Sequence, residues 1–176
     1  MKKLASLCFL AASLMAFTKL QAQDTEDKSK RPSPPAMVSQ KIKSGATIKI
    51  DYSQPSLKGR TIGKDVEPMD GQVWRTGANE ATIFETDKDL KIEGKMLPAG
   101  KYALFTIFDK DDATVIFNKT WQQWGAYKYD ESQDALRVKA DVDMKKTSTE
   151  KMTFTVSPGG DVALNWGDRE LEFEVK

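Results

Sequence analysis

Hydrophobic and polar residues alternate along most of the chain, which predicts β-strands rather than helices. Residues 136–144 alternate strictly, so their apolar side chains fall on one face of an extended strand. Residues 48–52 repeat the pattern, and three further sets end the chain: Met152/Phe154/Val156, Val162/Leu164/Trp166 and Leu171/Phe173/Val175. We therefore expect antiparallel strands with one face on a core and the other in solvent.

Turn residues divide these strands. Ser157-Pro158-Gly159-Gly160 predicts a hairpin loop, and Gly167-Asp168 predicts a two-residue loop, so the last three sets should form a meander. Residues 102–108 and 115–117 are apolar on both faces and predict central strands covered on each side, joined by a turn at 109–112. Shorter strands are expected at residues 72–75, 81–86 and 90–93.

About nine strands without helical periodicity predict an all-β fold, an antiparallel β-sandwich or flattened barrel. One short helical turn is expected at residues 120–123, where Thr120 and Gln123 match a capping box and Gly125 would end the turn.

The N-terminal residues have the pattern of an export signal. Lys2 and Lys3 precede a largely apolar run at residues 4–17, which is shorter than a membrane-spanning helix needs, so we expect a signal peptide (1–22) cleaved near Ala22. Residues 23–35 are charged or proline-rich and predict a disordered tether. The expected mature protein is a periplasmic or secreted β-sandwich domain (36–176) without a transmembrane segment.

Composition excludes several kinds of chemistry. The chain has no histidine, and its one cysteine, Cys8, lies in the expected signal peptide, so histidine-based nucleophilic catalysis and His or Cys metal sites are excluded from the mature protein. Asp109, Asp111 and Asp112 lack the remaining spacing of a calcium loop. We therefore predict no metal and no cofactor.

The charge balance argues against nucleic acid as a partner. The full chain has a formal net charge of +1 from 27 basic and 26 acidic residues. Removing residues 1–22 takes away three lysines and no acidic residue, which leaves 27 − 3 = 24 basic residues and a net charge of about −2. The charge balance leaves a small molecule or a glycan among the partners to expect, and the sequence carries no signal for the oligomeric state.

Several segments resemble signature segments of the bacterial family called domain of unknown function 2911. They are Ser33-Pro34-Pro35, DYSQPSLKGR at 51–60, VWRTGANEAT at 73–82, LPAGKY at 97–102, VIFNK at 115–119 and QWGAY at 123–127. The similarity spans about residues 33–139, with Met69 and Phe108 departing from the residues common in the family. The resemblance implies a secreted or periplasmic bacterial protein and implies no reaction.

The segment VWRTGANEAT brings four polar side chains to one sheet edge. Arg75, Thr76, Asn79 and Glu80 supply a guanidinium, a hydroxyl, an amide and a carboxylate, which suits the binding of a sugar or a carboxylate ligand. The alternative is structural: Trp74 anchors the core, Asn79 occupies a left-handed turn position, and Arg75 pairs with an acidic neighbour.

Three aromatic residues recur along the next polar loop. Trp121, Trp124 and Tyr127 lie near the amides of Gln122 and Gln123, a combination that can stack on a sugar ring and orient it. The alternative is that the two tryptophans close the open end of the sandwich.

Three classes of function remain open. The leading hypothesis is an exported, non-catalytic binding module for a carbohydrate or another cell-envelope component. The second is a glycan-directed enzyme using Glu/Asp acid-base chemistry, for which Glu80 and Asp130 are weak candidates and no catalytic residue is assigned. The third is a structural envelope protein that binds a partner.

Overall fold

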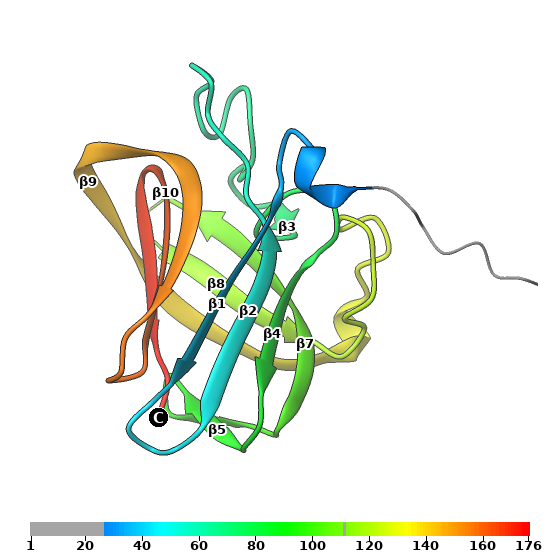
Figure 1. The fold of residues 1–176 in the computed structure, drawn as a ribbon, viewed down its shortest axis with the longest axis vertical. Helices are drawn as coiled ribbons and strands as arrows, with labels where there is room; N and C mark the ends of the chain where they lie inside the picture. The colour runs from blue at the N-terminus through cyan, green and yellow to red at the C-terminus, as the bar shows by residue number, and fades with distance from the viewer. Residues whose placement is uncertain (1–26, 111) are drawn as a thin grey trace, which may run out of the picture.

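The computed structural model describes residues 27–110 and 112–176. They form ten strands and two short 3-10 turns, joined by loops (Figure 1). The strands are β1 (Pro35–Lys41), β2 (Thr47–Ser53), β3 (Val73–Trp74), β4 (Thr82–Thr86), β5 (Leu90–Ile92), β6 (Lys95–Leu97), β7 (Gly100–Asp109), β8 (Asp112–Asn118), β9 (Asp134–Val156) and β10 (Asp161–Glu174). The turns are η1 (Lys28–Lys30) and η2 (Glu131–Gln133). The predicted all-β fold is confirmed.

One antiparallel sheet curls around the core. Its order is β1-β2-β4-β7-β8-β9-β10, β3 pairs with β7, and β5 and β6 form a separate pair. Figure 1 shows β9 and β10 standing across from β1 and β2. The segment that follows β2 meets β9 across the curl, where the Met152 N–H donates to the Pro55 carbonyl (3.0 Å) and the Leu57 N–H donates to the Glu150 carbonyl (2.9 Å). The fold is therefore close to a flattened barrel.

The inward side chains of the alternating strands fill the inside of this curl. Phe117 on β8 is fully buried at its centre. Its ring lies 5.1 Å from Phe84, 6.4 Å from Tyr102 and 6.1 Å from Phe173, measured between ring centroids, in edge-to-face arrangements. Three strands far apart in the sequence thus depend on one aromatic side chain.

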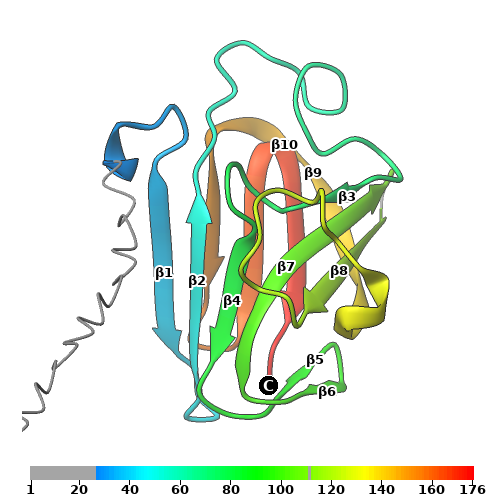
Figure 2. The same ribbon diagram turned by 90° about the vertical axis from the view of Figure 1, so that its right-hand side faces the viewer.

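A second, smaller apolar cluster covers the opposite face of β7 and β8. Phe105 and Ile116 are fully buried there, beneath Trp121 and Tyr129 of the 119–133 loop. The Phe105 and Tyr129 rings lie 5.0 Å apart. Figure 2 shows this loop crossing in front of β7 and β8. The prediction that these two strands are covered on both faces is confirmed, because the loop supplies the second cover.

The predicted meander at the C-terminus is partly wrong. The loop at residues 157–160 joins β9 to β10 as expected, with the Gly160 N–H donating to the Ser157 carbonyl (3.0 Å). Gly167 and Asp168 form no hairpin loop and lie inside β10, where the pairing with β9 shifts register. Gly167 has φ +61°, and a Cβ there would lie 2.5 Å from the Ile62 side chain. Turn loops and β-bulges both favour glycine, so the sequence signal was ambiguous.

The helical turn predicted at residues 120–123 is also wrong. The Gln123 side-chain amide donates to the Thr120 carbonyl (2.6 Å), whereas a capping box would use the Thr120 N–H. That N–H donates to the Asn118 side chain (2.9 Å). The Gln123 carbonyl accepts from the Ala81 N–H (3.0 Å), so pairing with a neighbouring segment replaces the helical bonds.

The N-terminal residues that the structure describes contact the domain. Residues 27–34 belong to the predicted disordered tether, yet the Arg31 guanidinium binds the Glu80 carboxylate (2.9 Å) and the Gln54 N–H donates to the Pro34 carbonyl (2.9 Å). These two contacts join the segment to the loop at Glu80 and to the end of β2. The expected signal peptide lies outside the described residues, and the domain boundary at residue 36 stays a prediction. Within the described chain, no helix is long and apolar enough to cross a membrane.

The packing around Phe117 predicts a large effect of truncation. Phe117→Ala should lower the free energy of unfolding by about 3 to 5 kcal/mol, because it opens a cavity against three aromatic rings. Met144→Ala, at a side chain that is mostly exposed, should change it by less than about 0.5 kcal/mol. Urea unfolding measures both, and equal losses would contradict this account of the core.

Candidate functional site

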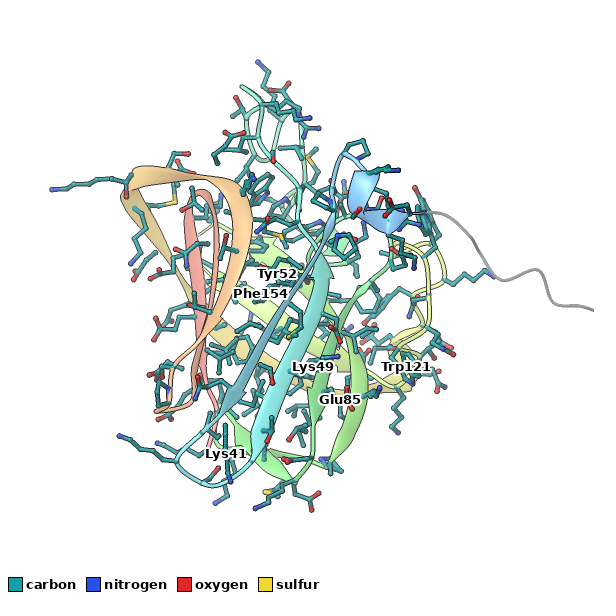
Figure 3. The ribbon with its side chains drawn as sticks, in the orientation of Figure 1. Lys41, Lys49, Tyr52, Glu85, Trp121 and Phe154 are labelled. Atoms are coloured by element: carbon teal, nitrogen blue, oxygen red, sulfur yellow. The ribbon has the colours of Figure 1, made fainter. Side chains whose placement is uncertain are left out.

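The two loops that carry the predicted site residues lie side by side. The Ala81 N–H donates to the Gln123 carbonyl and the Gly125 N–H donates to the Asn79 carbonyl, each at 3.0 Å. Residues 79–81 and 123–125 therefore run together like a short strand pair. Figure 3 shows Trp121 on this side of the domain, away from β9 and β10.

A groove of about 320 Å³ lies between the loops and the outer face of β4. Trp121 and Trp124 form its aromatic border, and Ile83 lies on its apolar floor. Polar groups reach the groove from Gln122, Gln123 and Glu80. We call this feature the tryptophan groove.

The aromatic residues of the loop differ in their roles. Trp124 is 54% exposed and Tyr127 is 85% exposed, and they are the exposed aromatic residues among those that the structure describes. Trp121 is half-buried and packs on the second apolar cluster. The structural alternative, closure of the fold by tryptophan, therefore fits Trp121 and does not fit Trp124.

Cations lie over both indole rings. The Arg31 guanidinium carbon is 5.7 Å from the centroid of Trp124, and the Lys101 ammonium is 5.4 Å from that of Trp121. Such contacts contribute on the order of 0.5 to 1 kcal/mol at exposed sites. The N-terminal segment therefore helps to fix the orientation of Trp124.

Glu80 is held by two cations of the N-terminal segment. Lys28 donates to Oε1 (2.9 Å), and Arg31 donates to Oε1 (3.0 Å) and Oε2 (2.9 Å). Partial burial acts to raise the pKa of Glu80, but hydrogen bonds from Lys28, its own backbone N–H and Arg31 outweigh burial and lower the pKa to about 2. A carboxyl group with this pKa is ionised at neutral pH and is not suited to act as a general acid.

Asp130, the other candidate for acid-base chemistry, does not line the tryptophan groove. Its carboxylate accepts a hydrogen bond from the Ser132 N–H (2.9 Å) and caps η2. The structure thus does not bring Glu80 and Asp130 together across this groove.

The comparisons with known proteins identify the family. The family model described as "Protein of unknown function (DUF2911)" matches residues 33–175. The chain belongs to this family. The match extends beyond the segments that carry the sequence resemblance, because it also includes β9 and β10. No curated protein and no solved structure matches the chain.

Thr76 serves the scaffold of this DUF2911 domain rather than a ligand. Its side chain is fully buried, and its Oγ1 donates to the Trp74 carbonyl (3.3 Å) and lies 3.1 Å from Thr106 Oγ1. Its carbonyl accepts from Thr82 Oγ1 (2.7 Å). The prediction that Thr76 binds a ligand is at odds with this burial, because the hydroxyl points into the sheet and is already bonded.

Asn79 has the structural role that was the alternative. Its φ is +58°, in the left-handed region that asparagine tolerates. Its side-chain amide donates to the Ser33 carbonyl (3.0 Å), so it also ties the N-terminal segment to the loop.

Arg75 lacks the acidic partner that the structural alternative required. Within residues 27–110 and 112–176 it forms no ion pair with a carboxylate, and its Nε is buried without a hydrogen-bond acceptor. Its Nη1 and the Tyr127 ring both lie within about 3.3 Å of where a Cβ of Gly125 would be. Arg75 is therefore placed in the DUF2911 fold without an obvious structural partner.

Sequence reasoning missed Lys28 and Arg31 as part of the site. Both lie in the segment predicted to be disordered, 52 and 49 residues from Glu80. The sequence signal was a short basic run, which by itself does not specify which carboxylate it binds.

Arg75 and Trp74 provide a matched test of scaffold against site. Arg75→Met should leave the free energy of unfolding unchanged or slightly higher, because the buried Nε has no described acceptor to lose. Trp74→Ala should cost about 3 to 5 kcal/mol, because the indole is buried and donates to the Gly77 carbonyl. The urea unfolding midpoints of the two variants test this expectation. If both substitutions lowered the free energy of unfolding equally, Arg75 would belong to the scaffold.

The ion pairs of Glu80 predict a dependence of stability on pH. The pKa of Glu80 is about 2 in the folded protein and near 4.5 in the unfolded chain, so its contribution is present above pH 4.5 and is lost as the pH falls toward 2. The urea midpoint of Glu80→Gln should therefore lie below that of the wild type at pH 7 and approach it by pH 2. Arg31→Met should show the same trend, and salt should weaken both effects. A constant difference across this range would contradict the ion-pair account.

Proposed function

We propose that this DUF2911 domain is an exported, non-catalytic binding module that holds a carbohydrate in the tryptophan groove. One observation carries the proposal: Trp124, an aromatic side chain that is 54% exposed, borders the groove together with Trp121, whereas the exposed Tyr127 does not line it. An indole left half in solvent costs hydrophobic free energy, and sugar-binding sites use such flat faces.

The polar groups of the groove suit a polyhydroxylated ligand. The Gln122 amide can donate to and accept from hydroxyl groups beside the ring, and the Glu80 carboxylate can accept from them. Ile83 supplies an apolar floor for the C–H face of a sugar.

The size of the groove limits the ligand. At about 320 Å³ it lies at the lower end of the ~300 to 1,000 Å³ typical of small-molecule pockets. The proposed ligand is therefore a single ring or a chain end of a cell-envelope glycan. Export rests on the signal-like residues 1–22 and on the family resemblance.

The test uses a glycan array that includes cell-envelope saccharides. We expect wild-type protein to bind a subset of glycans and Trp124→Ala to weaken that binding by about tenfold or more, because stacking on the indole is lost. Met96→Ala removes an equally exposed side chain on β6, outside the groove, and should leave binding unchanged.

Three results would contradict the proposal. Absence of binding to any glycan, or unchanged binding by Trp124→Ala, would remove carbohydrate from this groove. Conversion of a bound glycan to product by wild-type protein would favour the enzyme class instead. Thermal unfolding of both variants confirms that any loss comes from the groove and not from misfolding.

A further inference from the structure

A second cavity lies next to the loop that carries Arg75 and shares no lining residue with the tryptophan groove. Its volume is about 250 Å³. The side chains that matter for its chemistry come from four separate segments: Ser33, Arg60, Glu67, Trp74 and Arg75. We call it the arginine cavity.

Arg75 lines this cavity without a carboxylate partner among the described residues. Its Nε is buried out of reach of a ligand, so the Nη atoms are the donors that a ligand could meet.

Arg60 adds a second guanidinium whose charge is also not neutralised. Its Nε and Nη2 donate to the backbone carbonyls of Leu57 (3.0 Å) and Ser56 (2.7 Å), which fixes the plane of the group at the edge of the cavity. These acceptors are neutral. Neither Arg60 nor Arg75 forms an ion pair with a described carboxylate.

Glu67 is the acidic side chain of the cavity, and it does not neutralise the arginines. It forms no ion pair with either guanidinium in the described structure, although it lines the same cavity. The three ionised groups sum to a net charge of +1. The cavity therefore keeps an excess of positive charge and donors.

We propose that the arginine cavity binds an oxyanion group, a carboxylate or a phosphate, with Arg75 as the main donor. Guanidinium groups pair with both anions through charge-assisted hydrogen bonds. Ser33 also lines the cavity, and the Trp74 and Val66 walls suit an adjoining carbon skeleton. An anion can form charge-assisted hydrogen bonds with these guanidinium groups, which a neutral ligand cannot.

The volume sets the scale of the ligand. The cavity is smaller than the ~300 to 1,000 Å³ of most small-molecule pockets, so it fits the anionic end of a small molecule. The proposal for the arginine cavity does not depend on the proposal for the tryptophan groove, because the two sites share no lining residue.

The experiment titrates full-length mature protein with inorganic phosphate and, separately, with acetate, at constant ionic strength with chloride as the reference. We expect NMR chemical shifts of the protein to change saturably on titration. The probe that binds more tightly, phosphate or acetate, shows which of the two anion classes the cavity prefers. Arg75→Met should weaken that binding by about tenfold or more, Arg75→Lys should retain part of it, and Glu67→Gln should strengthen it by removing repulsion.

Unchanged affinity in Arg75→Met, or shifts no larger than those with chloride, would overturn the proposal. A gain in affinity on Glu67→Gln is a result that a purely structural Arg75 would not produce. Trp124→Ala should leave anion binding unchanged, and Arg75→Met should leave glycan binding unchanged, so each site can fail without the other.

Discussion

The apolar outer face of β7 and β8 is the constraint on which the rest of this structure depends. These two strands are buried on both sides, and Phe105 and Ile116 would lie in water if only the inner face of the sheet were covered. Burying two such side chains contributes on the order of 1.5 to 3 kcal/mol each. The 119–133 loop supplies the cover by packing Trp121 and Tyr129 on them. Because the loop is held there, its residues 123–125 can pair with residues 79–81. This pairing places Trp124 and Glu80 beside one groove.

A second interaction completes the site from the N-terminal side. Arg31 binds Glu80 with two hydrogen bonds and lies over the Trp124 ring, so one side chain fixes both a carboxylate and an indole. Its own side chain is only 9% exposed, whereas that of Glu80 is 38% exposed. Solvent therefore screens this ion pair in part, and its contribution is smaller than its geometry suggests.

The alternation of residues was enough to predict the fold class and most strands, because a period of two specifies one buried face wherever a sheet packs on a core. It could not tell a hairpin loop from a bulge at Gly167, since both need a residue that tolerates positive φ. The site was predicted in part. Glu80, Trp121 and Trp124 line one groove, whereas Arg75 lines a separate cavity. The burial of Thr76 and the partners of Glu80 depend on contacts between distant segments. No local pattern encodes such contacts.

The loop at residues 75–80 combines backbone strain with one unsatisfied donor, the Arg75 Nε. Thr76 and Asn79 have φ values of +53° and +58°, and for a β-branched residue such as Thr76 this conformation is unfavourable. Hydrogen bonds around Thr76, to Trp74, Thr106 and Thr82, hold the backbone in place. A loop whose sole task was to join β3 and β4 could use glycine at such a position and would not bury an Arg75 Nε without a described acceptor. The strain is therefore better explained by the side chains that the loop presents, Arg75 toward one cavity and Glu80 toward another, than by the connection it makes.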